Sequence, residues 1–186
     1  MRLAIALLSL NLLMCSSVAV AQAAPVNLGK APDWTLNSAD GSSVTLSETV
    51  ADQPVVLLFW ATWCPFCKAL MPHLQSIRLE YGEDVKILAL HFRDDKGDPI
   101  AFIRDAGYDF TLLQNSNDVA DLYKVWATPG VIVIDQDMQM RFNLYKLPKI
   151  DPPNTGKAPS HITRAAFRAP YWAAEIRKTL REIEED

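Results

Sequence analysis

The stretch WATWCPFC, residues 60–67, joins two different hydrophobic patterns and places Cys64 and Cys67 at their junction. The residues before it, 54–60, form a continuous apolar run, which is typical of a strand buried on both faces of a sheet. The residues after it carry a periodic apolar stripe, which predicts a helix over residues 65–81. The cysteine pair therefore lies at a strand-to-helix turn, with Cys64 at the helix N-cap.

The position of the pair at a helix start favours redox chemistry. Cysteine reacts as the thiolate, and the free N–H groups and positive dipole end of a helix N-terminus stabilise an anion. We therefore predict that Cys64 is the exposed nucleophile. Cys67 lies one helical turn further along, within reach of a disulfide, and we predict it to be the more buried resolving thiol.

Three other uses of these cysteines are less consistent with the sequence. A structural disulfide would not need the helix start, and closing so short a loop stabilises a fold least. A zinc site would need further ligands, and His73, His91 and His161 are scattered without metal-binding spacing. A peroxide-reducing cysteine is expected to follow a threonine by three residues, where this chain has Ala61. We therefore expect a redox pair that uses no metal and no other cofactor.

Strand and helix patterns alternate over the rest of the chain. Short β-prone runs at 34–36 and 44–46 flank Asp40-Gly41, a strong hairpin signal. This alternation predicts an α/β fold, and a second hairpin near the C-terminus makes the sheet mixed, with helices on both faces. Further strands are predicted over residues 85–92, 110–113, 131–134 and 141–145, and further helices over residues 99–106 and 117–123.

The first 23 residues have the pattern of a secretory signal peptide. Arg2 precedes an apolar stretch, and Ala21-Gln22-Ala23 fits the small-residue cleavage rule. An uncleaved membrane anchor and a lipid-modified Cys15 are the alternatives. Cleavage would leave one domain, residues 24–186, whose only cysteines are Cys64 and Cys67.

Two further features bound the domain. Residues 146–169 are rich in proline and predict a loop insertion, followed by a C-terminal helix over residues 170–186 that begins at Pro170.

The chain of 186 residues is 49% hydrophobic and 22% charged, as expected for a globular domain. Its net charge of −4 argues against a nucleic-acid partner, which would select clustered Lys and Arg.

The motif and its surroundings resemble the thioredoxin fold superfamily, and more closely the exported TlpA/ResA-like thiol–disulfide oxidoreductases. The resemblance rests on residues 59–67, on Pro72 five residues after the second cysteine, and on Thr128-Pro129 before the apolar run 131–134. It implies a thioredoxin-like fold with an N-terminal β-hairpin.

The resemblance also implies roles for residues around the cysteines. Pro129 would be a cis-proline facing the pair, and the backbone of Thr128 would bind an extended client segment. Trp63, Pro65 and Phe66 would form the docking surface, which Trp126 would extend.

The sequence departs from related proteins at two buried carboxylate positions. Leu58 stands where thioredoxins carry an aspartate behind the cysteines, and Leu70 stands where some TlpA-like proteins carry a glutamate. We therefore predict slower deprotonation of Cys67, a water route, or a substitute carboxylate, for which the candidates are Asp94, Asp95 and Glu48.

These features predict a periplasmic thiol–disulfide reductase, expected to be a monomer. Its clients would be disulfide-containing exported proteins, including apocytochrome c before haem attachment, and a membrane protein would supply or accept its electrons. The alternatives are a periplasmic disulfide oxidase or isomerase with the same residues, and a copper-binding module on the same fold. An uncleaved leader would anchor the protein in the membrane.

Overall fold

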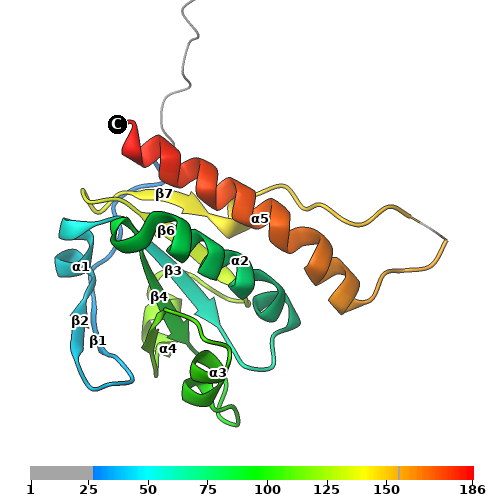
Figure 1. The fold of residues 1–186 in the computed structure, drawn as a ribbon, viewed down its shortest axis with the longest axis horizontal. Helices are drawn as coiled ribbons and strands as arrows, with labels where there is room; N and C mark the ends of the chain where they lie inside the picture. Colours follow the sequence, from blue (N-terminus) through cyan, green and yellow to red (C-terminus); the bar gives the residue numbers. More distant parts are fainter. Residues whose placement is uncertain (1–26, 155) are drawn as a thin grey trace, which may run out of the picture.

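The fold is built around β3 (Val55–Trp60), the strand that leads into the cysteine pair. A computed structural model describes residues 27–154 and 156–186; the predicted leader, residues 1–23 with Cys15, lies outside them. All six residues of β3 are buried, as its continuous apolar run predicts. β3 is the middle strand of a five-stranded sheet of order β5-β4-β3-β6-β7 (Figure 1).

Apart from the C-terminal helix, the predicted elements are present with bounds close to those expected. β4 (Lys86–His91) and β5 (Thr111–Leu113) extend the sheet by parallel pairing, and β6 (Gly130–Ile134) and β7 (Met140–Asn143) extend it by antiparallel pairing. The mixed sheet is thereby confirmed. The helices are α1 (Leu46–Asp52), α2 (Pro65–Tyr81), α3 (Pro99–Asp105), α4 (Asn117–Leu122) and α5 (His161–Glu184), with single 3-10 turns η1 (Gly82–Asp84) and η2 (Leu144–Lys146).

Alternate side chains of β3 enter two different cores. Val56, Leu58 and Trp60 pack in the core that contains both cysteines and side chains of α2, α3 and α5. Val55, Leu57 and Phe59 pack on the other face, in a core completed by residues of α1, α4 and the N-terminal segment. Helices therefore cover both faces of the sheet, and α2 and α5 pack against each other on one of them (Figure 1).

The C-terminal helix begins earlier than predicted. The sequence places its start at Pro170, at the end of an insertion over residues 146–169, but α5 begins at His161 and passes through Pro170. Ser160 caps it, because the Ser160 hydroxyl accepts a hydrogen bond from the Thr163 N–H at 3.1 Å. The described segment without helix or strand is therefore shorter, residues 147–154 and 156–160, and it extends away from the sheet before α5 returns (Figure 1).

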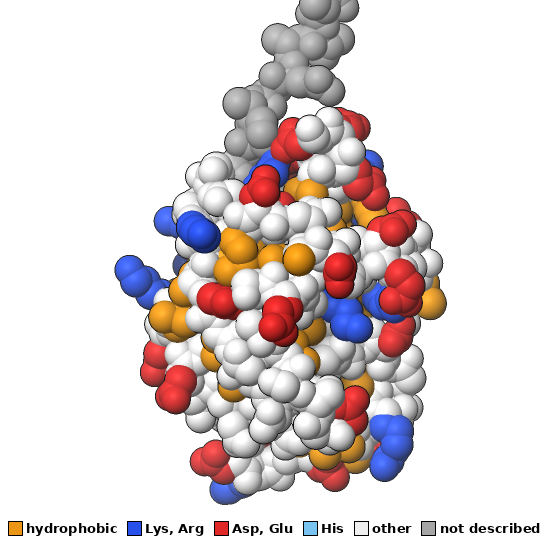
Figure 2. All heavy atoms as spheres, turned by 90° about the vertical axis from the view of Figure 1, so that its left-hand side faces the viewer, with side chains coloured by type: hydrophobic (Ala, Val, Ile, Leu, Met, Phe, Trp, Pro, Cys, Tyr) orange, Lys and Arg blue, Asp and Glu red, His pale blue; other side chains and the backbone are white. Residues whose placement is uncertain are grey.

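The predicted N-terminal hairpin is also present. β1 (Thr35–Asn37) and β2 (Ser43–Thr45) pair antiparallel as a separate two-stranded sheet. Figure 2 shows the side of the molecule where this hairpin and α1 lie; among the side chains described there, acidic and basic groups are interspersed and form no continuous basic patch.

Candidate active site

The structure places Cys64 at the N-cap of α2, as predicted, with its side chain turned back onto the first turn of the helix. Its sulfur accepts a hydrogen bond from the Cys67 N–H at 3.0 Å and forms a disulfide with Cys67, whose Cα lies 5.3 Å from that of Cys64. An N–H group aimed at Sγ stabilises negative charge there, so the geometry favours Cys64 as the thiolate of the reduced pair.

The predicted exposure of Cys64 is wrong for this disulfide form. Only 1% of Cys64 is exposed, and Cys67 is fully buried. Both cysteines belong to the core under α2, and the disulfide joins them there. Solvent is therefore largely excluded from the disulfide.

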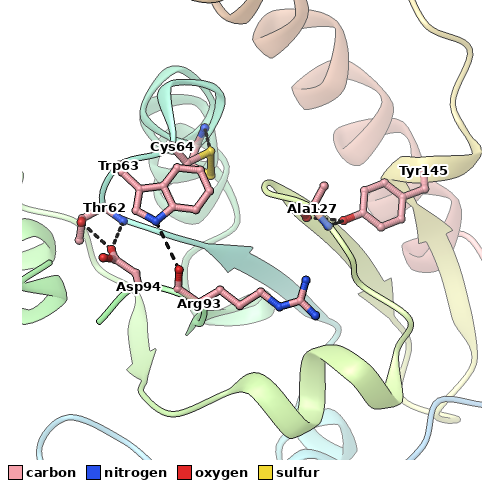
Figure 3. Close-up of a disulfide and its surroundings, with 8 residues drawn as sticks. Thr62, Trp63, Cys64, Arg93, Asp94, Ala127 and Tyr145 are labelled. Atoms are coloured by element: carbon pink, nitrogen blue, oxygen red, sulfur yellow. Dashed lines mark hydrogen bonds between the residues drawn. A yellow bond between two sulfur atoms is a disulfide. The ribbon is translucent and has the colours of Figure 1, made fainter. Parts of the chain in front are cut away.

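The Thr128–Pro129 peptide bond is cis, as predicted. Phe59 of β3 pairs with Gly130 of β6, so the segment after β3 and the segment before β6 leave the sheet at the same edge. The cysteine pair and the Thr128–Pro129 loop are therefore neighbours, and Figure 3 shows Cys64 facing the loop that carries Ala127. Among the described residues, none hydrogen-bonds the backbone amide or carbonyl of Thr128.

The predicted docking residues differ in their accessibility. Trp63 is 59% exposed and Trp126 is 71% exposed. Phe66 is half-buried, because its ring lies 6.1 Å from that of Trp172 in α5. Pro65 is the first residue of α2 and is also half-buried. Their roles in client binding stay predictions.

A buried carboxylate, Asp94, holds the loop that precedes Cys64. Its side chain is 3% exposed and accepts hydrogen bonds from the Thr62 N–H at 2.7 Å and the Thr62 hydroxyl at 2.5 Å (Figure 3). It also lies 3.1 Å from His91 Nε2 and accepts the Gly97 N–H at 3.0 Å. Burial alone would raise the pKa of Asp94, but these hydrogen bonds outweigh it and hold the pKa well below its usual range.

None of the three candidate carboxylates has the environment of a proton acceptor for Cys67. Asp94 is committed to four donors, and its lowered pKa makes it a weak base. Asp95 is exposed. Glu48 lines a surface hollow with Lys86, which pairs with the first residue of β3, at the opposite end of the sheet from the cysteines. Leu58 itself is fully buried in the cysteine core.

Gly97 is required by the close packing around Asp94. A Cβ at this position would lie 2.0 Å from Thr62 Oγ1 and 2.5 Å from an Asp94 oxygen. We expect Gly97→Ala to lower the free energy of unfolding by about 1–3 kcal/mol, because the loop must shift to relieve the overlap. Urea denaturation measures the change, with the exposed neighbouring substitution Lys96→Ala as the control. Equal stability of the two variants would contradict the close packing.

The histidines do not gather near the sulfurs. His91 contacts Asp94 and Trp60, whereas His161 lies against Phe66 with ring centroids 6.1 Å apart. Within residues 27–154 and 156–186, no group of three or more His, Cys, Asp or Glu side chains is arranged to hold a metal ion.

Comparison with known proteins adds the family. The model of the AhpC/TSA family matches residues 29–143, more than half of the chain. The chain belongs to the AhpC/TSA family. Among relatives, the thiol-disulfide oxidoreductase ResA of Oceanobacillus iheyensis is 37% identical over 110 residues, which cover 56% of this chain and 57% of ResA. The thiol:disulfide interchange protein DsbE of Escherichia coli is 26% identical over 128 residues, covering 63% of this chain and 68% of DsbE.

These relatives confirm the predicted TlpA/ResA-like resemblance within the AhpC/TSA family. A crystal structure of an uncharacterized conserved protein from Geobacillus kaustophilus has a TM-score of 0.65 at 23% identity, covering 87% of this chain and 82% of that one. The fold is thioredoxin-like, as predicted. Ala61 stands three residues before Cys64, and the neighbouring Thr62 hydroxyl donates to Asp94.

Proposed function

We propose that the protein is an exported thiol–disulfide oxidoreductase that reduces disulfides in other exported proteins. The observation that carries the proposal is the Cys64–Cys67 disulfide at the N-terminus of α2, beside a loop with a free backbone edge at Thr128. A helix N-terminus favours the attacking thiolate, and a free backbone edge offers hydrogen bonds to an extended client.

The proposed reaction has two exchanges. The Cys64 thiolate attacks one sulfur of the client disulfide, the client S–S bond breaks, and the other client sulfur leaves as a thiolate that takes up a proton. Cys67 then loses its proton and attacks Cys64 in the mixed disulfide, which releases the second client sulfur as a thiolate. The client gains two electrons and two protons, and the Cys64–Cys67 disulfide forms. A dithiol of an electron-donor protein, which we propose to lie in the membrane, must then reduce this disulfide.

The reductase direction is supported by the charge near Cys64. Asp94 is bonded to Thr62, two residues before Cys64, and its lowered pKa keeps it ionised at neutral pH. A negative charge near Cys64 opposes the thiolate, against the stabilisation that the helix N-terminus supplies, and so shifts the pair toward the disulfide form. A pair that is more stable as the disulfide is the stronger reductant.

Location and clients belong to the same proposal. The A-x-A pattern before Ala24 and the names of the relatives ResA and DsbE support an extracytoplasmic protein, which we expect to be a periplasmic monomer. Among the described helices, none has the length and apolarity needed to cross a bilayer. Apocytochrome c before haem attachment is the specific client that we propose from the family resemblance.

The direction is tested by trapping the pair in living cells. Acid quenching followed by alkylation with a mass-shifting reagent separates reduced from oxidised Cys64 and Cys67. We expect a mainly reduced pair, which becomes mainly oxidised when the cells lack the electron donor. A mainly oxidised pair in unperturbed cells would contradict the reductase and favour a disulfide oxidase.

A further inference from the structure

An apolar pocket of about 240 Å³ lies beside the Thr128–Pro129 loop. One side is formed by this loop and by Phe66 of the cysteine motif, and the other by residues after β7 and by α5. An apolar cavity of about 150 Å³ is enough to bind benzene, so this pocket can hold one large side chain. Its aromatic and basic lining residues are Phe66, Trp126, Tyr145, Trp172, Lys149 and Arg168.

Much of this pocket lies outside the segment that the family model matches. The match ends at residue 143, whereas Tyr145, the segment 147–150, Arg168 and Trp172 come after it. The pocket therefore has one wall at the cysteine site and a second wall formed by residues that follow the matched segment.

Side-chain contacts tie the two walls together. The Tyr145 hydroxyl donates to the Ala127 carbonyl and accepts a hydrogen bond from the Ala127 N–H at 3.2 Å. The Tyr145 ring stacks on Trp126 with centroids 5.2 Å apart. On the opposite side, Phe66 meets Trp172 of α5. The pocket thus spans the distance between the residue before Cys67 and the loop before Pro129.

The outer wall is held in place by Arg168. Its Nε donates to the Ile150 carbonyl at 2.7 Å, and its terminal nitrogen donates to Asp151 at 2.6 Å. These bonds fasten the insertion to α5. The Arg168 guanidinium also lies over the Phe66 ring, 5.8 Å from its centroid.

The charge at the rim is positive. The charged residues that line the pocket are Lys149 and Arg168, and no described carboxylate is among the lining residues. Asp151 offsets the charge of Arg168, whereas exposed Lys149 makes no ion pair within the described part of the chain. The positive charge at the rim therefore favours a ligand that carries an acidic group.

We propose that this pocket binds a large aliphatic or aromatic side chain of an extended client polypeptide, close to the client's target disulfide, while a carboxylate of the same segment meets Lys149. The proposal rests on the proposed function and names its preferred substrates. The client backbone pairs with the unbonded amide and carbonyl of Thr128, which lies beside the pocket. Client choice then depends on the neighbours of the target cysteine and not on the disulfide alone.

The test uses the reduced full chain and short peptides whose single cysteine carries a small-thiol disulfide. The peptides differ in having Phe, Leu or Ser beside the cysteine, and Glu or Lys next to that residue. We expect the Phe and Leu peptides to react about tenfold faster in kcat/KM than the Ser peptide, the range that one apolar pocket supplies. Trp126→Ala should reduce this ratio, and Lys149→Glu should reverse the preference for Glu over Lys.

Matched controls are available at exposed residues outside the pocket. Lys157→Glu makes the same charge change in the insertion, outside the pocket, and Leu79→Ala removes a 73% exposed apolar side chain of α2. Both should keep the wild-type preferences. Equal rates for all peptides, with a small non-peptide disulfide still reduced, would overturn the pocket assignment alone. If the wild type reduced none of these disulfides, the proposed function would be overturned, and this inference with it. Concentration-dependent dimerisation that Trp126→Ala abolishes would show that a second copy of this chain occupies the pocket instead of a client.

Discussion

Replacement of Cys64 by serine is expected to lower the rate of disulfide exchange by roughly 10³-fold or more, because a hydroxyl at this position is not ionised at neutral pH and cannot form the mixed disulfide. The measurement is the rate at which the reduced protein cleaves a small-molecule disulfide. The substitution exchanges sulfur for oxygen at a helix N-cap, where serine is favoured, so the fold should remain intact.

Cys67→Ser is the matched partner of this experiment. It keeps the nucleophile and removes the group that resolves the mixed disulfide, so we expect client proteins to stay covalently linked to Cys64. Non-reducing electrophoresis of cell extracts measures the adducts, and the double variant should show none. If Cys67→Ser formed no adduct while Cys67→Ser and wild type had similar circular dichroism, the two-step exchange would be wrong.

Asp94→Asn is expected to lower the free energy of unfolding by about 2–4 kcal/mol. The carboxylate accepts hydrogen bonds from Thr62 and Gly97. An asparagine amide would place its own N–H group opposite at least one of these N–H or O–H groups, so that hydrogen bond would be lost. Urea denaturation at pH 7 measures the loss. Asp95→Asn is the matched control, because Asp95 is the exposed neighbouring carboxylate and should change stability little.

The contribution of Asp94 should depend on pH with a definite sign. Its pKa in the folded protein is lower than the ordinary value of 3.8, because hydrogen bonds favour the ionised form despite burial. The unfolded chain then binds a proton more readily, so the stabilisation is fully present above the ordinary pKa and is lost as the pH falls toward the folded value. The difference in unfolding free energy between wild type and Asp94→Asn should shrink below about pH 4. A difference that stays constant from pH 7 to pH 3 would show that Asp94 does not act through its charge.

The central part of the fold could be predicted because the local patterns there agree with the tertiary environment. β3 is a continuous apolar run and is buried on both faces. α2 has the expected bounds, with Pro65 at its start and an apolar stripe toward the core. In both elements, short-range sequence information already specifies which side chains are buried.

The sequence did not predict features that depend on distant partners. The start of α5 was missed because Pro170 suits a first helical turn. The available signals before that proline were the cap at Ser160 and the buried residues Ala165 and Ala169. The burial of Cys64 depends on the core around it, which distant segments of the chain complete. Asp94 could be named as a candidate carboxylate, but its bonds to Thr62 join residues 32 positions apart. Because of those bonds, Asp94 accepts hydrogen bonds from the loop before Cys64 and does not serve as a base for Cys67.

Arg93 connects the two loops that meet at the disulfide. Its carbonyl accepts the Trp63 Nε1–H at 3.4 Å, and its guanidinium donates to the Trp126 carbonyl at 3.3 Å and to Asp121 at 3.1 Å. These contacts all lie within residues 29–143, whereas the outer wall of the apolar pocket is fastened separately by Arg168. The residues around the disulfide and the residues that we propose to select the client are thus positioned by different sets of hydrogen bonds. We therefore expect substitutions at Lys149 and Ile150 to change client choice while the Arg93 contacts beside the disulfide stay in place.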